Sequence, residues 1–416
     1  MARGWSLSRR RSKCAGRRRR LGALRAVQYD LADPGFPASL IEAAEPALPG
    51  PAWARVAVSV GGICGSDLHL FSNNMGPSPT LIPLARAFPF VLGHEIGGTV
   101  VEAGPACDVA TGTRVAVNPD INCAARGIEP RCPACAAGWP SSCHNAGSGV
   151  LTPGTALGFT SGLGGGWAEQ LVAHRSMLFP VPDAVPDGAV SLHEPLSIAL
   201  HGLLRARPTD GDPVLVIGAA IIGLATVAAL RAVCPTSEIT IVARHDHQAQ
   251  AAAALGVDHV VMDQPDRSHF EALAAASGAR RSGERKRTML IGGFPYVVDA
   301  VGYPGTVNDA LRAVDNRGRV LLLGAASTAE YDLTPVWWKE AALVGAVRHS
   351  TDPDVPGGPT RHSIERALEI LAAGGLPAET VITHRFALEE HRQAIETALD
   401  RRNRASIKVV FTPNAT

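Results

Sequence analysis

Four cysteines lie within 21 residues of the sequence, a density typical of a metal site built from one loop. Cys132 and Cys135 form a C-x2-C pair, Cys143 follows after seven intervening residues, and Cys123 precedes the pair. A tetrahedral structural zinc takes four such ligands, and a C-x2-C pair supplies two of them from one turn. Disulfides are the competing interpretation, but they belong to oxidising compartments and we expect no export of this chain. The cluster therefore predicts structural zinc.

The first ligand of this cluster has two candidates. Cys123 stands nine residues before Cys132, whereas a compact lobe would place a donor about three residues before it. Glu129 occupies that nearer position, and a carboxylate also binds zinc. Both remain open, and we favour Cys123 because a thiolate is the softer ligand.

A second group of potential ligands is spread over three segments. Cys64 lies in a glycine-rich turn, His94 and Glu95 follow an apolar run, and Glu194 precedes the α/β part of the chain. Each residue alone is common in a protein core. Together they offer a thiolate, an imidazole and carboxylates, and three such ligands with an open position define a catalytic zinc that can polarise a bound alcohol.

A glycine turn follows the apolar run 213–217. Gly218, Ala220, Ile222 and Gly223 then lead into a helical pattern, the order of strand, turn and helix that a dinucleotide pyrophosphate requires. Ala220 stands where a second glycine would let the phosphates approach the backbone closely. We therefore expect a displaced pyrophosphate and weaker binding.

The next predicted strand, 239–242, ends in Arg244 instead of the acidic residue that would bind ribose hydroxyls. An arginine at this position favours a 2′-phosphate and hence NADP. A solvated arginine is the alternative, so NAD and NADP both remain open.

The surrounding sequence indicates two kinds of architecture. Up to about residue 181 it is strand-like and rich in loops, and from about residue 212 strands and helices alternate, which predicts a parallel sheet with helices on both faces. The expected strands are 214–217, 239–242, 257–262, 296–300, 319–323 and, at the end, 406–411. The expected helices are 222–233, 248–255, 306–314 and 362–373.

Charge is unevenly distributed over the 416 residues, although the formal net charge is only +1. Ten basic residues fall within 1–25, before the first acidic residue at Asp30, so the rest of the chain is acidic. A block of like charges predicts a disordered arm, and its lack of interleaved aromatic residues gives no support for specific nucleic-acid binding. The uncharged stretch 213–230 has the pattern of a strand, a turn and a helix, not of one continuous helix, so we expect no membrane span.

Taken together, these motifs resemble the zinc-dependent medium-chain alcohol dehydrogenases, particularly the polyol and sorbitol dehydrogenase-like branch. The resemblance covers roughly residues 25–412. It rests on CGSDLH (64–69), GHEIGGTVVEAG (93–104), CPACAAGWPSSC (132–143), GGWAEQLVAH (165–174), HEPLSIALHG (193–202), VLVIGAAIIG (214–223), VDAVG (298–302), GRVLLLG (318–324) and IKVVF (407–411).

The resemblance implies an α/β protein with a β-rich GroES-like catalytic domain and a doubly wound Rossmann sheet. The implied division is a basic disordered arm (1–24), a catalytic domain with a structural zinc lobe (25–190), an NAD(P)-binding domain (191–340) and a return to the catalytic domain (341–416).

The resemblance also implies residue roles. Catalytic zinc would be held by Cys64, His94 and one or both of Glu95 and Glu194, the last being the feature of the polyol branch. Asp67 would orient His94, and Ser66 would pass the substrate proton toward His69. Val301, Gly302, Leu323 and Gly324 would line the nicotinamide.

Two insertions depart from the family pattern, near 72–87 and 279–293, and we expect the basic second one to be a solvated loop. The expected protein is a cytoplasmic NAD(P) alcohol dehydrogenase with two zinc ions per chain, acting on a secondary alcohol as a homodimer or homotetramer. A zinc-dependent aldehyde or ketone reductase and a non-catalytic zinc-stabilised binding protein are the alternatives.

Overall fold

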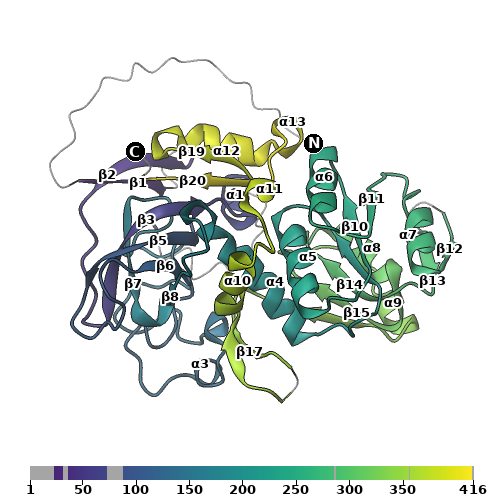
Figure 1. Ribbon diagram of the computed structural model, residues 1–416, viewed down its shortest axis with the longest axis horizontal. Coiled ribbons are helices and arrows are strands. Elements are labelled where there is room, and N and C mark those ends of the chain that lie inside the picture. The colour runs from purple at the N-terminus through teal and green to yellow at the C-terminus, as the bar shows by residue number, and fades with distance from the viewer. Residues whose placement is uncertain (1–22, 31–35, 73–87, 285–286, 356, 415–416) are drawn as a thin grey trace.

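The computed structural model describes residues 23–30, 36–72, 88–284, 287–355 and 357–414. The predicted basic arm, apart from its last two residues, and nearly all of the first insertion lie outside these ranges. The rest forms two β-sheet regions that lie side by side with helices between them (Figure 1).

The first region is a mostly antiparallel sheet of seven strands with a smaller sheet beside it. The order of the large sheet is β19-β20-β3-β5-β6-β8, with β7 also paired to β3, and the small sheet has the order β2-β1-β4. The strands are β1 (Leu24–Tyr29), β2 (Ala38–Ala43), β3 (Trp53–Gly62), β4 (Phe90–Val91), β5 (Glu95–Ala103), β6 (Arg114–Val117), β7 (Gln170–His174), β8 (Leu178–Pro180), β19 (Ile382–Phe386) and β20 (Lys408–Phe411). Its helices are α1 (Gly65–Ser72), α3 (Pro133–Ala136), α12 (His391–Leu399) and α13 (Arg401–Arg404).

The second region is a parallel sheet of six strands in the order β11-β10-β9-β14-β15-β16. This is the Rossmann order. The first three strands extend the sheet to one side of β9 and the next three extend it to the other side, which leaves a crevice at the carboxyl ends of β9 and β14. The strands are β9 (Val214–Ile217), β10 (Ile239–Ala243), β11 (His259–Met262), β14 (Phe294–Asp299), β15 (Val314–Leu322) and β16 (Ala342–Gly345). The helices are α5 (Ile221–Val233), α6 (Asp246–Ala254), α7 (Phe270–Ser277), α8 (Pro304–Ala313) and α9 (Thr334–Trp338).

The helix α4 (His193–Arg205) joins the two regions. Leu196, Leu200 and Leu203 are fully buried on it and belong to one core cluster with residues of both sheets. Each such side chain contributes about 2 kcal/mol by leaving water. The helix α4 packs on α5 and on α10 (Ser363–Ala372), which leads the chain back through α11 (Ala378–Val381) to β19.

Two expectations need correction. The predicted limit of the Rossmann part at residue 340 cuts off β16, which pairs in parallel with β15 and completes the sheet. The insertion 279–293 is not simply a loop: β12 (Arg280–Ser282) and β13 (Met289–Ile291) form an antiparallel pair. Leu290, which lies opposite Arg281, is fully buried and gives this pair an apolar anchor that the basic composition of the insertion conceals.

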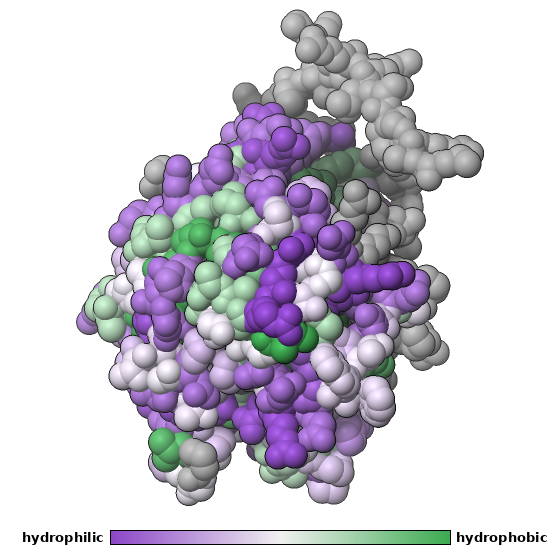
Figure 2. All heavy atoms as spheres, turned by 90° about the vertical axis from the view of Figure 1, so that its right-hand side faces the viewer, coloured by the Kyte–Doolittle hydropathy of each residue, from purple (hydrophilic) through white to green (hydrophobic). Residues whose placement is uncertain are grey.

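Among the described residues, no helix is both long and apolar enough to span a membrane. The face of the six-stranded sheet region seen in Figure 2 is largely hydrophilic, with limited apolar areas between charged side chains.

Candidate active site and zinc lobe

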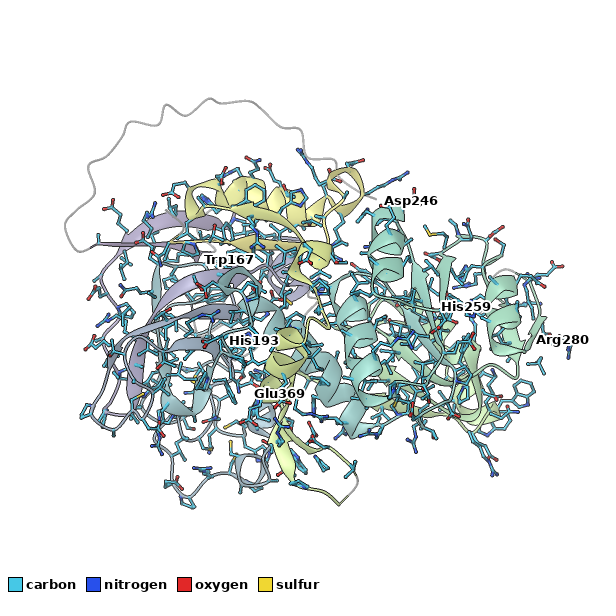
Figure 3. The ribbon with its side chains drawn as sticks, in the orientation of Figure 1. Trp167, His193, Asp246, His259, Arg280 and Glu369 are labelled. Carbon is cyan, nitrogen blue, oxygen red and sulfur yellow. The ribbon has the colours of Figure 1, made fainter. Side chains whose placement is uncertain are left out.

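The first potential ligands are positioned at the end of β3 and the start of β5. The carboxylate of Asp67, on α1, accepts a hydrogen bond of 2.9 Å from the backbone N–H of Cys64, and so fixes the turn between β3 and α1. His94 follows Gly93, whose φ of +94° suits glycine and whose Cβ, if present, would lie 2.3 Å from Trp167 Cδ1. Trp167, labelled in Figure 3, therefore packs against the backbone immediately before His94 and leaves no room for a side chain at position 93.

These residues converge around the His94 ring. Its Nδ1 lies 3.3 Å from Asp67 Oδ1, and its Nε2 lies 3.2 Å from Ser66 Oγ. Burial alone would lower the pKa of His94, but the neighbouring Asp67 and Cys64 raise it well above its usual value. The structure thus brings Cys64, Ser66, Asp67 and His94 together, as the sequence predicts.

Glu95 and Glu194 differ in their surroundings. Glu95 is fully buried and forms an ion pair with Lys408, which also donates a hydrogen bond of 3.0 Å to the carbonyl of Ile63. Glu194 lies in the first turn of α4, is 2% exposed, and its Oε2 has no hydrogen-bond partner within the described part of the chain. Glu95 is therefore neutralised, while Glu194 offers an unsatisfied carboxylate.

Several charges act on Glu194. The pKa of Glu194 is raised to about 8, mainly by burial and also by the charges of Glu95 and Asp120, against the opposing charges of His94 and Lys408. A buried carboxylate in this position needs a cation or a hydroxyl donor to stabilise its charge. The donor types of Cys64, His94 and Glu194 suit zinc, and an ion there would satisfy the orphaned oxygen. Among the described residues, however, only the four cysteines of the lobe place all their ligand atoms within 4.8 Å of one another.

His349 is a residue of this site that the sequence reasoning missed. Its Nε2 lies 3.5 Å from Glu194 Oε1, and its Nδ1 lies 2.7 Å from Ser197 Oγ. Because the Ser197 hydroxyl donates to the Glu194 carbonyl at 2.8 Å, Nδ1 of His349 must be the donor to Ser197. Burial lowers the pKa of His349 well below its usual value, so Nε2 is a free acceptor facing Glu194. Lys408 was also missed, although a lysine inside a buried strand signals a buried partner.

The backbone beside His349 is unusual. Arg348 has a φ of +54°, a conformation that non-glycine residues adopt only when other contacts hold them there. Its guanidinium lies 2.7 Å from the buried carboxylate of Asp120 and donates to the Ser141 carbonyl at 2.9 Å. These bonds attach the returning chain to the lobe of the first region while His349 faces α4.

His69 lies in the last turn of α1, three residues after Ser66, so the two share a helix face. Burial lowers the pKa of His69, and the charge of Arg401 lowers it further.

The predicted cofactor turn lies between β9 and α5. Gly218 has a φ of +99°, Ala220 precedes the first residue of α5, and Ile222 lies half-buried in its first turn. A Cβ on Gly223 would lie 1.7 Å from the Gly218 carbonyl, so only glycine permits this approach of helix and turn. The methyl group of Ala220 is tolerated by the backbone, which has φ −81° and ψ −172° there.

The two predicted nicotinamide loops meet at the carboxyl edge of the same sheet. Asp299, at the end of β14, accepts a hydrogen bond of 2.9 Å from the N–H of Val301. A Cβ on Gly324 would lie 2.1 Å from the nitrogen of Gly302, so the loops at 301–302 and 323–324 are in contact. They lie at the switch between β9 and β14, where a dinucleotide is expected.

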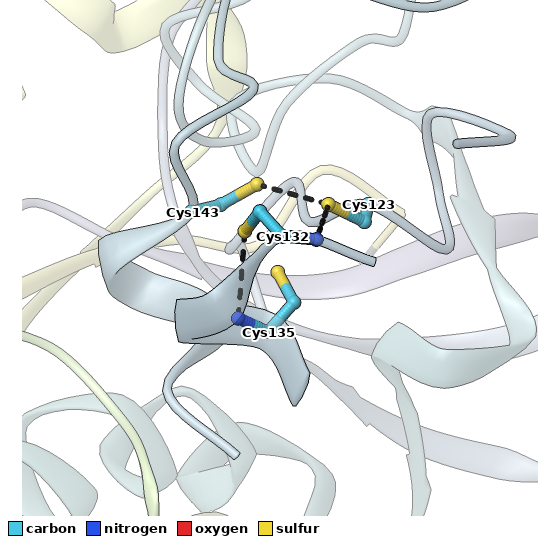
Figure 4. A group of neighbouring side chains, drawn as sticks. All are labelled: Cys123, Cys132, Cys135 and Cys143. Atoms are coloured by element: carbon cyan, nitrogen blue, oxygen red, sulfur yellow. Dashed lines mark hydrogen bonds between the residues drawn. The ribbon is translucent and has the colours of Figure 1, made fainter. Parts of the chain in front are cut away.

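The four cysteines of the lobe converge as the sequence predicts (Figure 4). Their sulfur atoms all lie within 4.8 Å of one another. Backbone N–H groups of Cys135 and His144 each donate to Cys132 Sγ at 3.5 Å, and the Asn145 side chain donates to Cys123 Sγ at 3.3 Å. Four free thiols surrounded by donors suit a tetrahedral zinc thiolate site.

Of the two candidates for the first ligand, Cys123 belongs to this group and Glu129 does not. Cys123 is fully buried, and its Sγ lies 3.6 Å from that of Cys143. Glu129 has a side chain that is 73% exposed and faces Arg131 at 3.6 Å. The nine-residue interval is possible because residues 124–128 form a turn in which the Ile128 N–H bonds back to the Cys123 carbonyl at 2.9 Å.

Comparison with known proteins agrees with this geometry. Residues 50–183 match the family of alcohol dehydrogenase GroES-like domains, and residues 222–373 match the zinc-binding dehydrogenases. L-Idonate 5-dehydrogenase of Vitis vinifera is 29% identical over 87% of this chain and 88% of its own, and sorbitol dehydrogenase of Arabidopsis thaliana is 29% identical over 87% and 89%.

Solved structures share the fold. A zinc-binding dehydrogenase of Sinorhizobium meliloti bound to NADP has a TM-score of 0.72 and 26% identity, covering 94% of this chain and 99% of its own. The RspB protein of Escherichia coli, complexed with NADH, has a TM-score of 0.73 and 24% identity over the same shares.

The GroES-like and Rossmann sheets, together with the four-cysteine lobe, define a zinc-dependent dehydrogenase. The chain belongs to the zinc-dependent medium-chain alcohol dehydrogenases and is an NAD(P)-dependent alcohol oxidoreductase. The predicted family resemblance and fold class are confirmed.

Proposed function

We propose that this dehydrogenase oxidises a secondary alcohol group of a polyol or sugar derivative. The observation that carries the proposal is the orphaned Oε2 of Glu194, which lies buried beside His94 and Lys408 where the family binds catalytic zinc. In this proposal Cys64, His94 and Glu194 hold the ion, whereas Glu95 remains paired with Lys408.

Bound zinc supplies the Lewis acidity that makes an alcohol hydroxyl acidic near neutral pH, and NAD(P) accepts the hydride. The chain's own residues hold and move the proton. Asp67 holds the His94 ring through Nδ1 so that Nε2 faces the site. Ser66 Oγ lies 3.2 Å from that Nε2, where it can accept the alcohol proton and pass it toward His69 on the same helix face.

A substrate with several hydroxyl groups is supported by the acceptors around Glu194. Neutral Nε2 of His349 and the carboxylate of Glu194 are both buried and short of donors. A second hydroxyl of a polyol would supply such a donor, whereas a simple alkyl alcohol would leave His349 unsatisfied. Relatives named as sorbitol, idonate and D-arabinitol dehydrogenases add support.

The test is metal analysis of the purified chain together with initial rates on secondary alcohols, polyols and sugar acids, with NAD and NADP. Two zinc ions per chain and reduction of cofactor by a polyol are expected. Turnover of simple alkyl alcohols alone would refute the polyol assignment, and turnover that survives Cys64→Ala would refute the zinc site.

Reduction of a ketone is the same chemistry in reverse and is the second candidate. It is supported by a relative in Saccharomyces cerevisiae named as a probable diacetyl reductase, which is 27% identical over 85% of this chain. Rates measured from both directions at the same pH distinguish the two. The family assignment leaves the non-catalytic binding protein without support.

We also propose that the chain is a homodimer, or a tetramer built from such dimers. The strand β16 forms an edge of the six-stranded sheet, and Leu343 on it is 40% exposed. Trp337 on the neighbouring α9 is 79% exposed. An apolar sheet edge of this kind is suited to pairing with a second copy. Sedimentation analysis, with Leu343→Lys as the disrupting variant, tests this arrangement.

The division of the chain into a catalytic part (25–190), a nucleotide-binding part (191–340, extended to 345 by β16) and a returning part remains our proposal, testable by limited proteolysis. A cytoplasmic location is likewise proposed. Its support is the four free thiols of the lobe, which a reducing compartment maintains.

A further inference from the structure

The long interval between Cys123 and Cys132 contains a feature that ligand spacing alone does not explain. Its residues form a turn in which the Ile128 N–H donates to the Cys123 carbonyl at 2.9 Å and the Arg126 N–H donates to the Asn122 carbonyl at 3.1 Å. Within this turn Arg126, three residues after Cys123, is fully buried. The interval therefore places a buried cation close in sequence to the first ligand of the lobe.

Backbone carbonyl groups surround the guanidinium of Arg126. Its Nη1 donates to the Ser148 carbonyl at 2.9 Å, and Nη1 and Nη2 each lie 3.3 Å from the Thr152 carbonyl. Nη2 also donates to the Gly154 carbonyl. The Gly154 N–H in turn donates to the Ala146 carbonyl at 2.9 Å, which closes the loop that holds the guanidinium. Arg126 is thus fixed by the segment that follows the last cysteine of the lobe.

The charge of Arg126 has no carboxylate partner. Within the part of the chain that the structure describes, Arg131 of the same interval pairs with Glu129, whereas no ion pair includes Arg126. The Nε of Arg126 is buried and, among the same residues, has no hydrogen-bond partner. Carbonyl groups satisfy N–H donors but carry no net charge. A buried cation is strongly destabilising unless an anion compensates it, so we expect an anion nearby.

A short series of hydrogen bonds links Arg126 to two ligands of the lobe. The Ser148 carbonyl accepts from Arg126, and the Ser148 N–H donates to the Asn145 carbonyl at 3.1 Å. Asn145 donates through its backbone to Cys143 Sγ at 3.4 Å and through its side chain to Cys123 Sγ at 3.3 Å. These two sulfur atoms lie 3.6 Å apart and form one edge of the cluster (Figure 4).

The thiolates of this edge supply the missing anion. Four thiolates and one Zn²⁺ ion leave a net charge of −2 on the lobe. Burial lowers the pKa of Arg126, whereas the negative charges of Cys143 and Cys123 act in the opposite direction. Attraction between opposite charges is strong where water is excluded.

We propose that Arg126 is the buried counter-charge of the zinc–thiolate cluster and that it slows the loss of zinc from the lobe. The long interval after Cys123 then has a role besides ligand spacing, because its turn delivers this cation. The inference rests on zinc in the lobe and not on the identity of the alcohol substrate.

Two substitutions separate the charge of Arg126 from its hydrogen bonds. Arg126→Lys keeps the charge and loses the planar set of donors, whereas Arg126→Gln keeps an amide donor and loses the charge. Arg131→Gln is the matched control, because it removes a charge from the same interval at a side chain that is 55% exposed.

The experiment follows metal transfer from the full chain to a chelator, for the zinc form and for a cobalt-substituted form. Four thiolates give cobalt in the lobe an intense sulfur-to-metal charge-transfer band, which the proposed catalytic site with its single thiolate does not match. Arg126→Gln should lose the lobe metal at least about tenfold faster than the wild type, and its band should move to longer wavelength, because uncompensated thiolates donate electrons more readily. Arg126→Lys should remain within about threefold of the wild type, and Arg131→Gln should be unchanged.

A lobe with less negative charge provides a second measurement. Cys143→His replaces one thiolate by a neutral imidazole, a ligand set that structural zinc also adopts, and so lowers the net charge to −1. In that background Arg126→Gln should accelerate metal loss only about threefold. If Arg126→Gln alone does not fold, recovery of a folded, metal-loaded chain in the double variant supports the counter-charge.

Metal loss from Arg126→Lys as fast as from Arg126→Gln would overturn the proposal and make Arg126 a clamp for the loop 146–154. An unchanged rate or band in Arg126→Gln would overturn it too, as would equal acceleration in the Cys143→His background or a double variant that still fails to fold. Failure of the proposed alcohol oxidation is separable, because it would appear as absent turnover while these differences in metal loss persist.

Discussion

Lys408 and Glu95 form a buried ion pair across a glycine. Their strands, β20 and β5, lie on either side of β3, where Gly62 is opposite both Val410 and Glu95. A Cβ on Gly62 would lie 1.8 Å from Glu95 Oε2, so only glycine leaves room for the pair. The pair neutralises one of the two buried glutamates of the site and leaves Glu194 without a cationic partner of its own.

We expect Lys408→Met to lower the free energy of unfolding by about 3 to 5 kcal/mol, because Glu95 would then be a buried charge without a partner. Urea denaturation measures this loss. The double variant Lys408→Met/Glu95→Gln should recover most of it, since no unpaired charge remains. A double variant as unstable as the single one would show that packing of Lys408, not the pair, stabilises the protein.

Replacement of Glu194 tests the catalytic ligand set. Glu194→Gln should reduce zinc from two ions per chain to about one, because the neutral amide binds zinc poorly while the cysteine lobe is untouched. Metal analysis after dialysis gives the count. The double variant of Lys408 and Glu95 should retain two ions, and loss of zinc there would make Glu95 a ligand after all.

The lobe allows a direct comparison of its two candidates. Cys123→Ser should remove the structural zinc and lower the thermal unfolding temperature, since a lost structural metal ligand costs folding energy. Glu129→Gln should leave both unchanged, as its side chain is exposed. The reverse result would move the first ligand to Glu129.

The free energy of unfolding should also depend on pH, through the titration of His362. Burial lowers the pKa of His362 to about 4, from about 6.5 in the unfolded chain. The unfolded state therefore binds the extra proton first, and stability is lost as the pH falls from about 6.5 to 4. The loss from this residue approaches about 3 kcal/mol at pH 4.

His362→Asn provides the comparison for that loss. His362 caps α10 by accepting from the Ile364 N–H at 3.2 Å, and asparagine preserves a capping acceptor without titrating. Urea unfolding at pH 7 and pH 4.5 should show a smaller acid loss in the variant. An equal loss would assign the acid sensitivity to other buried histidines.

Ala220→Gly should lower the dissociation constant of the cofactor several-fold, because removal of the methyl group lets the pyrophosphate approach the backbone of the turn. Ala220→Ser adds an atom at the same position and should have the opposite effect. Fluorescence titration with NADPH measures both. An unchanged or weaker affinity in the glycine variant would contradict this account of the turn.

Local sequence patterns were sufficient to predict most of the strands and helices of the fold. Short apolar runs bounded by Gly218 or Arg244 identified β9 and β10, and cysteine spacing identified the lobe, because these signals lie within a few residues of each other. What could not be predicted depends on contacts between distant segments. Lys408 meets Glu95 across 313 residues, and His349 meets Ser197 across 152.

The helix α4 supports residues of both the proposed metal site and the proposed cofactor site. Glu194 begins this helix, and two turns later a Cβ on Gly202 would lie 2.5 Å from Leu323 Cδ2, in a predicted nicotinamide loop. Cys64 and His94, by contrast, are attached to the other sheet. In the proposed ligand set, a tilt of the nucleotide-binding region carried by α4 therefore changes the distance from Glu194 to Cys64 and His94. We therefore expect the affinity of this proposed site for zinc to depend on the relative orientation of the two sheet regions.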